Sequence, residues 1–507
     1  IGENGFCACN EVYQPAELTT DKYDIDGDDS KDAVYEISNA GQLYWFAGLV
    51  NGTLSSVTQK TSANAVLTAD IVVNANVLKS DGTLNEGTFK EWTPIATSAS
   101  PYTGIFEGQN HTISGLYFKQ ENTSEVGFFG YNGGKISNVG ILNSYFCGFS
   151  RVGGVCGYNS STITNCYNKG VVDGTADGAS SFGGVCGCNL GILTNCYNTG
   201  IIKGQSFVGG VSGDNNKTIT NCYNTGIVSG QSYVGGVNGY NKNGTIINCY
   251  TTSEVNGTGS HVGGVIGMNL SNGTITNCYY DSTIYTGNAI GANDGTTEKV
   301  EGKTTEQFKT GEVAYLLQNG QSEEIWGQTI GTDTYPVLHG PKVYKSITYM
   351  GCNDSSEIAS VSYSNEKKDV FGKHNFEDGI CRYCGEKLAA TVTKGDETIS
   401  CVSLPEAISY AENMPDSVVT VMEDTNTALD INNPDSDFTI DINGHKTDDI
   451  DVKNGKITII DSKTGGDVKG HLDIKKDSTV TIGNVKISGT IHTMGQLILN
   501  GGDINKI

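Results

Sequence analysis

Long apolar runs, basic residues, proline and charged residues are all scarce in this sequence. No run of about 18 apolar residues occurs, so the sequence offers no membrane-spanning helix. Lys and Arg number 32 against 56 Asp and Glu, for a net charge of −24. Such an excess repels phosphate backbones and argues against nucleic acid as a partner. Only 17% of the residues are charged, so Asn, Thr and Ser must cover much of the surface.

Glycine is abundant instead, with 68 of 507 residues, while proline numbers only 8. The glycines follow no strict third-residue period, which excludes a collagen-like chain. A length of 507 residues predicts about three domains. No His-Glu-x-x-His occurs, so the sequence lacks that zinc-peptidase motif.

Two short blocks recur together along the middle of the chain. The block Val-Gly-Gly-Val-x-Gly begins at Val152, Val208, Val234 and Val262, and Phe182 leads a further copy. The block Asn-Cys-Tyr follows each copy and places its cysteines at Cys166, Cys196, Cys222, Cys249 and Cys278. The copies lie 26 to 30 residues apart, from Gly127 to Gly263. This period is too short for the usual helical repeats.

The residues between these blocks form short strand-like runs bounded by Gly and Asn. We therefore predict an all-β fold, a right-handed parallel β-solenoid over roughly residues 100–290, with coils about 4.8 Å apart. The right-handed sense follows from the preference of parallel crossovers. The five cysteines should stack inward as reduced thiols, and the five tyrosines should form a second ladder. Corner glycines should supply positive φ. Stacked amides should form a turn ladder from Asn159, Asn189, Asn215, Asn241 and Asn269.

Val-Gly-Gly-Val-x-Gly followed by Asn-Cys-Tyr-Asn-x-Gly resembles the GLUG-type repeats of large bacterial surface proteins. Such repeats occur in adhesin-like proteins of gut anaerobes and beside the protease modules of some immunoglobulin A peptidases. The resemblance covers roughly residues 20–340. It implies an extracellular protein, attached to the cell surface through parts missing from this chain, with a host glycan or a host surface protein as partner.

The composition changes along the chain and predicts four regions. Residues 1–20, which contain Cys7 and Cys9, are interpreted as the remnant of a preceding Cys module. Residues 21–340 should form the solenoid with short capping helices, one from Ser38 or Asn39 to about Val50 and one from Thr304 to about Asn319. Residues 341–390 should form a small Cys/His module. Residues 391–507 should begin a second, truncated β-helix.

One set of side chains in the third region has the composition of a zinc site. It consists of Cys352, His374, Cys381 and Cys384, and the last two form a Cys-x-x-Cys pair. Three thiolates and one imidazole match a structural zinc set. Disulfides or free thiols are the alternatives. We expect Glu377 or Asp378 to hold the second ring nitrogen of His374.

A second candidate is a dense run of carboxylates around Gly27. Alternating Asp oxygens can converge on a calcium ion when the loop turns at a glycine. A solvated acidic loop is the alternative. The candidate ligands are Asp24, Asp26, Asp28 and Asp32.

Support for catalysis is weak, because sugar-cleaving β-helices need paired carboxylates on neighbouring coils. Asp173, Asp177 and Asp214 instead occupy unlike parts of their repeats. We therefore predict a non-enzymatic adhesin or display stalk. The alternatives are a carbohydrate-active β-helix enzyme and a glycan- or immunoglobulin-binding module. Aromatics for the binding module would be Phe182, Phe207 and Tyr233, unless these pack in the core.

Overall fold

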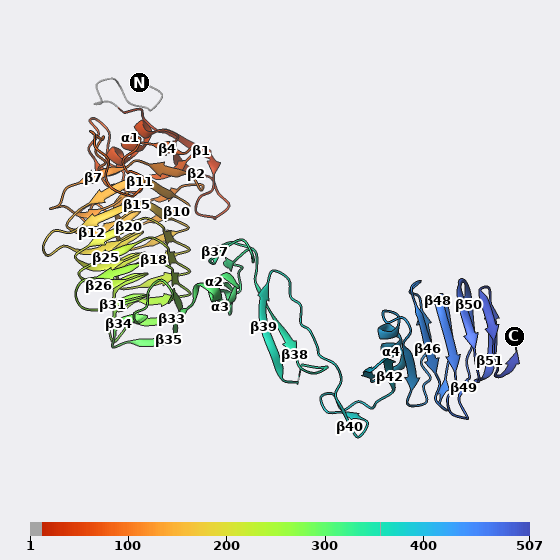
Figure 1. Cartoon of the computed structure of the whole chain (residues 1–507). Coiled ribbons are helices and arrows are strands. Elements are labelled where there is room, and N and C mark those ends of the chain that lie inside the picture. Colours follow the sequence, from red (N-terminus) through yellow and green to blue (C-terminus); the bar gives the residue numbers. More distant parts are fainter. Residues whose placement is uncertain (1–12, 355, 507) are drawn as a thin grey trace. The chain divides into compact units, whose positions relative to one another are not determined.

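The computed structural model describes residues 13–354 and 356–506, which form two compact units (Figure 1). Unit 1 extends to Lys345 and includes Tyr363–Glu366, and unit 2 comprises Ser346–Ser362 and the chain from Lys367 onward. The chain passes between the units within the ribbon of β38 (Tyr344–Tyr349) and β39 (Ile358–Ser364). Cys7 and Cys9 lie outside the described residues.

Unit 1 is a parallel β-solenoid, as predicted, and from β8 onward its coils add strands to three sheets. The large sheet contains β1 (Glu17–Tyr23), β2 (Asp32–Ile37), β3 (Asn64–Leu67), β4 (Ile71–Val72), β5 (Ile105–Glu107), β6 (Thr112–Ser114), β7 (Tyr117–Lys119), β10 (Lys135–Ser137), β11 (Gly140–Cys147), β14 (Thr162–Thr164), β15 (Tyr167–Gly174), β18 (Ile192–Thr194), β19 (Tyr197–Asn198), β20 (Ile201–Gly204), β23 (Thr218–Thr220), β24 (Tyr223–Asn224), β25 (Val228–Gly230), β28 (Thr245–Ile247), β29 (Tyr250–Thr251), β30 (Val255–Gly257), β33 (Thr274–Asp281) and β35 (Thr296–Lys303). The second sheet contains β8 (Ser124–Val126), β12 (Ser150–Gly153), β16 (Ser180–Gly183), β21 (Ser206–Gly209), β26 (Ser232–Gly235) and β31 (Val262–Gly263). The third sheet contains β9 (Phe129–Asn132), β13 (Cys156–Asn159), β17 (Cys186–Asn189), β22 (Ser212–Asn215), β27 (Asn238–Asn241), β32 (Ile266–Asn269) and β34 (Ile290–Asn293).

The parallel pairing extends beyond the predicted span of 100–290 at both ends. β2 pairs with β3 and β3 with β5 before it, and β33 pairs with β35 after it. β1 pairs antiparallel with β2, so this strand crosses the predicted boundary at residue 20. The right-handed winding stays a prediction.

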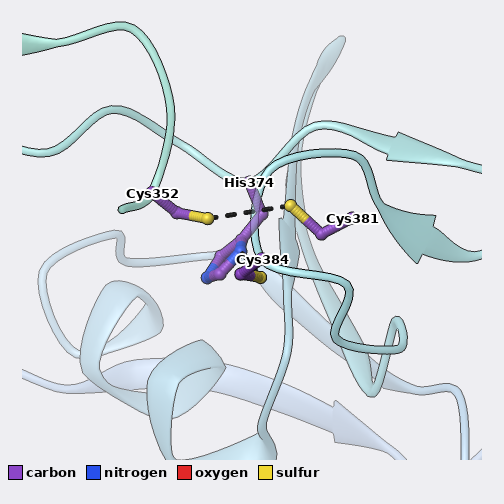
Figure 2. Close-up of side chains that lie close together, drawn as sticks. All are labelled: Cys352, His374, Cys381 and Cys384. Carbon is purple, nitrogen blue, oxygen red and sulfur yellow. Dashed lines mark hydrogen bonds between the residues drawn. The ribbon is translucent and has the colours of Figure 1, made fainter. Parts of the chain in front are cut away.

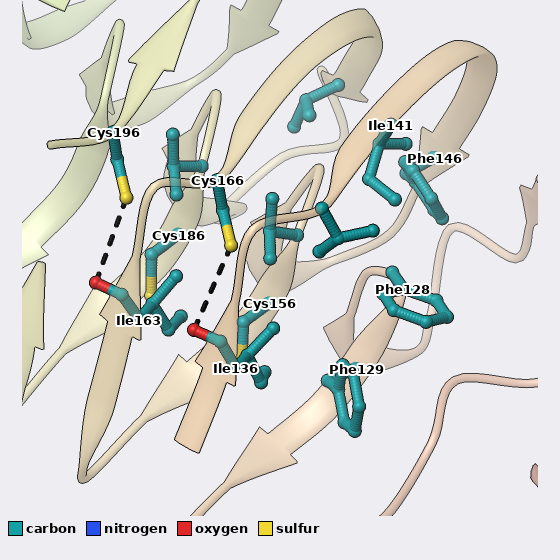
Figure 3. Close-up of a cluster of buried hydrophobic side chains, with 14 of the residues drawn as sticks. Phe128, Phe129, Ile136, Ile141, Phe146, Cys156, Ile163, Cys166, Cys186 and Cys196 are labelled. Carbon is teal, nitrogen blue, oxygen red and sulfur yellow. Dashed lines mark hydrogen bonds between the residues drawn. The ribbon is translucent and has the colours of Figure 1, made fainter. Parts of the chain in front are cut away.

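The repeat cysteines point into the core, as predicted (Figure 3). All five are fully buried, and none of the cysteines in the described part of the chain is in a disulfide. Each thiol lies 3.2–3.3 Å from the carbonyl oxygen two residues before it, as Cys166 does from Thr164. The same geometry in every coil makes each cysteine a small core residue whose S–H has an acceptor.

The predicted amide ladder is present and longer than expected. Asn189 Nδ2 donates to Asn215 Oδ1 at 2.8 Å, and Asn215 Nδ2 donates to Asn241 Oδ1 at 2.9 Å. Asn132 begins the series and Asn293 ends it. The sequence analysis missed these two because the blocks around them are degenerate. A second internal ladder, from Asn168 through Asn198 and Asn224, was also missed.

The expectation that the corner glycines supply positive φ is wrong. The residues in the left-handed region are the asparagine of each Asn-Cys-Tyr block, such as Asn165 at φ 53°, and the residue before each Val/Phe-Gly-Gly, such as Phe207. The Gly-Gly pairs are needed for space instead. A Cβ on Gly153 would lie 2.3 Å from the carbonyl oxygen of Cys156, and one on Gly209 2.0 Å from that of Ser212. Asn tolerates positive φ better than most residues, which explains its choice there.

Helix α1 (Ala40–Asn51) begins at the N-cap Asn39, whose side chain accepts the backbone N–H of Gln42. The sequence predicted one apolar face, but α1 is buried almost all round. Tyr44 on α1 stacks edge-on against the buried Trp92 at 5.1 Å.

The predicted C-terminal cap consists of α2 (Thr305–Lys309), α3 (Glu312–Gln318), β36 (Trp326–Gly327) and β37 (Val337–Leu338). Thr304 and Gln307 form the expected capping box. The cap packs against the tyrosine ladder on the flank of the solenoid, where Phe308 and Trp326 contact Tyr250. The sequence suggested only that it covers an end.

Unit 2 contains the small module and the second β-helix, and the buried core of the second β-helix extends from Ala390 to Ile491. The module includes the hairpin of β40 (Phe376–Glu377) and β41 (Ile380–Cys381). The second β-helix begins with an antiparallel hairpin and α4 (Leu404–Ala411), and parallel strands follow. Its strands are β42 (Ala390–Lys394), β43 (Glu397–Cys401), β44 (Val418–Val421), β45 (Leu429–Ile431), β46 (Asp437–Asp441), β47 (Lys446–Thr447), β48 (Ile450–Ile460), β49 (Asp467–Val468), β50 (Leu472–Ile482), β51 (Lys486–Thr493), β52 (Gln496–Leu499) and β53 (Asp503–Lys506).

The amide ladder should contribute measurably to the stability of unit 1. Asn215→Ala removes the donor to Asn241 and an acceptor in a fully buried row, so the free energy of unfolding should fall by about 1–3 kcal/mol. Asn272→Ala is the matched control, since its contact with Asn243 is exposed, and should cost less than about 0.5 kcal/mol. Tryptophan fluorescence during urea unfolding reports on unit 1 alone, because all three tryptophans lie there. Equal losses in both variants would contradict the ladder's role.

The repeat cysteines should be unreactive in the folded protein at pH 8. All five thiols are fully buried, so a reagent cannot reach them, and burial also raises the pKa of Cys166 to about 12. Alkylation followed by peptide mapping should modify none of the five before unfolding and all five afterwards. Disulfide-linked peptides joining Cys196 to Cys222 would refute this expectation.

Candidate metal centre

The four residues of the predicted zinc set lie together in the small module (Figure 2). Their ligand atoms all lie within 4.8 Å of one another. Cys352 follows β38, His374 precedes β40, Cys381 ends β41, and Cys384 lies in the turn after it. The turn of the Cys-x-x-Cys pair is closed by the backbone N–H of Gly385, which donates to the carbonyl of Cys381 at 2.8 Å.

The distances within this group suit a tetrahedral ion. The sulfurs of Cys352 and Cys381 are 3.7 Å apart, and Cys384 Sγ lies 3.5 Å from His374 Nδ1. A tetrahedron with zinc–sulfur bonds of ~2.3 Å and a zinc–nitrogen bond of ~2.0 Å has edges of about 3.8 and about 3.5 Å. The donor set and its spacing therefore fit zinc.

The thiols of the group differ in how readily they ionise. Burial opposes ionisation of Cys381, but the backbone N–H groups of Cys384 and Tyr383 stabilise its thiolate, and its pKa falls to about 6. Burial and the neighbouring thiols Cys384 and Cys381 raise the pKa of Cys352 to about 12. A cation would be needed to hold both as thiolates near neutral pH.

The carboxylate that holds His374 comes from the second β-helix. His374 Nε2 lies 3.4 Å from Glu406 Oε1, while Nδ1 faces Cys384. Glu406 is the first-turn acid of α4, and its other oxygen accepts the backbone N–H of Val402 at 2.9 Å. The sequence expected Glu377 or Asp378 here. It could not indicate Glu406, because this residue lies in the region assigned to the second β-helix.

The acidic loop satisfies most of its own oxygens. Asp24, Asp26 and Asp28 come within 4.8 Å of one another, but they accept backbone N–H groups of the loop at 2.8–3.1 Å. Asp32 is not in the group, since it accepts the N–H of Ile25 at 2.8 Å. The calcium assignment stays a prediction for all four residues, of which Asp32 lies outside the close group.

The other candidate residues are dispersed. Asp173 lies on β15 of the large sheet and accepts the hydroxyl of Tyr145, whereas Asp214 lies on β22 of the third sheet. Among the aromatics, Phe182 is fully buried. Phe207 and Tyr233 are partly exposed and pack on Tyr240.

We propose that the four residues hold a structural zinc ion, with Glu406 orienting His374. The purified chain should contain one zinc, and Cys384→Ser should reduce it to background. Glu406→Gln should weaken zinc affinity about 10–100-fold and keep the stoichiometry. Cys401→Ser, which alters a buried cysteine outside the group, should retain the ion. Elemental analysis and titration with a chelating dye measure these effects, and zinc-free wild-type protein would refute the proposal.

Known proteins resemble parts of this chain. Residues 150–173 match the GLUG motif. Over 104 residues the chain is 34% identical to Halomucin from Haloquadratum walsbyi (strain DSM 16790 / HBSQ001), a match that covers 20% of this chain and 1% of Halomucin. The crystal structure of a "putative immunoglobulin A1 protease" from Bacteroides ovatus is similar over 61% of this chain and 92% of that one, with 22% identity and a TM-score of 0.43. The resemblance to GLUG repeats is thus confirmed, and the chain contains a GLUG motif within a parallel β-solenoid.

Proposed function

We propose that the chain is a non-catalytic part of an extracellular surface protein, acting as a display stalk or adhesin. The observation that carries this proposal is the uninterrupted register of unit 1. Identical residues lie above one another from coil to coil, as in the series Asn159, Asn189 and Asn215. Such stacking resists bending and suits a spacer.

The GLUG repeat and the likeness to Halomucin support a location on the cell surface or outside the cell. Within residues 13–354 and 356–506, no helix is long and apolar enough to cross a membrane. Buried, unpaired thiols in such a protein suit an oxygen-poor habitat.

The dispersed carboxylates favour binding over sugar cleavage. Asp173 and Asp214 lie on different sheets, and Asp177 accepts an N–H from the side chain of Gln205. Retaining and inverting glycosidases need two carboxyl groups about 5–10 Å apart across a substrate. The proposed partner is therefore a host glycan or host surface protein that is bound and not altered.

Beads coated with the full chain test this function. They should adhere to host epithelial cells, whereas beads coated with the urea-unfolded chain should not. Incubation with polysaccharides should release no reducing sugar. Release of reducing ends would overturn the non-catalytic assignment, and equal adhesion by both bead types would overturn the adhesin.

A further inference from the structure

An outward stripe of Asn-x-Tyr pairs runs along one flank of unit 1. In each Asn-Cys-Tyr block the cysteine points inward, so the asparagine and the tyrosine flank it on the outer surface. The tyrosines are in register, and the rings of Tyr167, Tyr197 and Tyr223 stack at 4.7 and 4.8 Å. The stripe therefore repeats one arrangement of amide and phenol at every coil.

The C-terminal cap occupies half of this stripe and shows what the stripe binds. Trp326 donates its indole N–H to Asn221 Oδ1 at 3.2 Å, and its ring lies edge-on to Tyr223 and Tyr250 at 6.0 and 5.5 Å. Each amide-tyrosine pair can therefore hold a flat ring that carries a hydrogen-bond donor at its edge.

The other half of the stripe is open. Asn165, Tyr167, Asn195 and Tyr197 line a groove of about 240 Å³ with Asn110. The cap residues Leu338 and His339 complete it.

The open half lacks the hydrogen bond that the covered half makes. Asn195 Oδ1 is buried and accepts no hydrogen bond, whereas Asn221 Oδ1 in the next coil accepts one from Trp326. His339 at the rim is held at φ 58°, in the left-handed region. Strain of this kind occurs more often at binding sites than elsewhere.

The lining selects the class of ligand. None of the seven lining residues is Asp, Glu, Lys or Arg, and a neighbouring ammonium, Lys169 Nζ, lies over the Tyr167 ring at 5.3 Å, so the polar groups of the lining are mainly uncharged amides and phenols. β15 and β19 are paired on both sides, so no strand edge is free for a peptide backbone. Amides both donate and accept, as vicinal hydroxyls require, and a phenol ring packs against an apolar ring face.

We propose that this groove binds one ring of a neutral glycan. Its volume is below the about 300 Å³ of the smallest pockets for drug-sized ligands, which suits a single sugar ring. The hydroxyls of the ring would bond to the amides and phenols that line the groove. This inference rests on the proposed adhesin function only for where the glycan comes from, namely a host surface. Sugar binding by the groove is tested separately from adhesion.

The experiment titrates the full chain with neutral trisaccharides of glucose, mannose, galactose and N-acetylglucosamine, and follows binding by saturation-transfer NMR. At least one should bind with Kd of about 1 mM, as expected of a single ring. Asn195→Gly keeps the left-handed backbone and deletes the amide, and should weaken binding about tenfold. Asn248→Gly deletes the equivalent amide, which is only 9% exposed, and should leave binding within twofold.

Thermal unfolding of each variant confirms that it is folded before binding is compared. No saturation transfer from any of the four sugars overturns the site, as does equal binding by wild type and Asn195→Gly. N-acetyltryptophanamide is the competitor, and its binding in place of every sugar would assign the groove to an aromatic peptide instead. If the sugars fail while coated beads still adhere to cells, the adhesin survives and only this groove is rejected.

Discussion

The amide-to-amide hydrogen bond between successive coils is the interaction on which unit 1 depends. A fully buried asparagine must satisfy two donors and an acceptor without water; nearby backbone groups take part of this role, and an identical residue one coil away supplies the rest at the right spacing. That requirement fixes the register of all three sheets at once. The inward cysteines and the outward tyrosines then fall into rows of their own, because they lie at fixed distances along the same coil.

Much of this could be predicted from the sequence, since a repeat records what lies above and below each residue. The period gave the parallel stacking, and Asn-Cys-Tyr gave the inward thiols. Segments that pack against the side of the solenoid do not repeat, so the sequence period does not show where they lie. The contact of Trp326 with Asn221 joins residues from a repeat and a non-repeat segment, so the position of the cap could not be foreseen. The conformation of Asn165 was also missed, because glycine was the more familiar explanation for a turn.

The candidate metal centre was likewise predictable only in part. Its four ligands could be selected from residue type and spacing, because no other cysteine or histidine occurs in residues 341–390. The role of Glu406 could not, because a first-turn acid of a helix already has a sufficient explanation. In the structure Glu406 lies in the first turn of α4 and also contacts His374, and the ring of His374 is thereby fixed against α4. The small module and the second β-helix are thus joined at the side chain that orients a ligand.

The inner amide ladders also have a direction. From Asn132 to Asn293 each Nδ2 donates to the next coil along the chain, and the shorter series from Asn168 runs the same way. If one side-chain amide were flipped, its Nδ2 would face the Nδ2 of one neighbour and its Oδ1 would face the Oδ1 of the other. The direction of the hydrogen bonds can therefore change only in the whole row at once. Coils of the same sense can be added or removed anywhere in the row with every bond restored. The length of such a rod is therefore free to vary by gain or loss of whole repeats, whereas an inverted repeat could not join it.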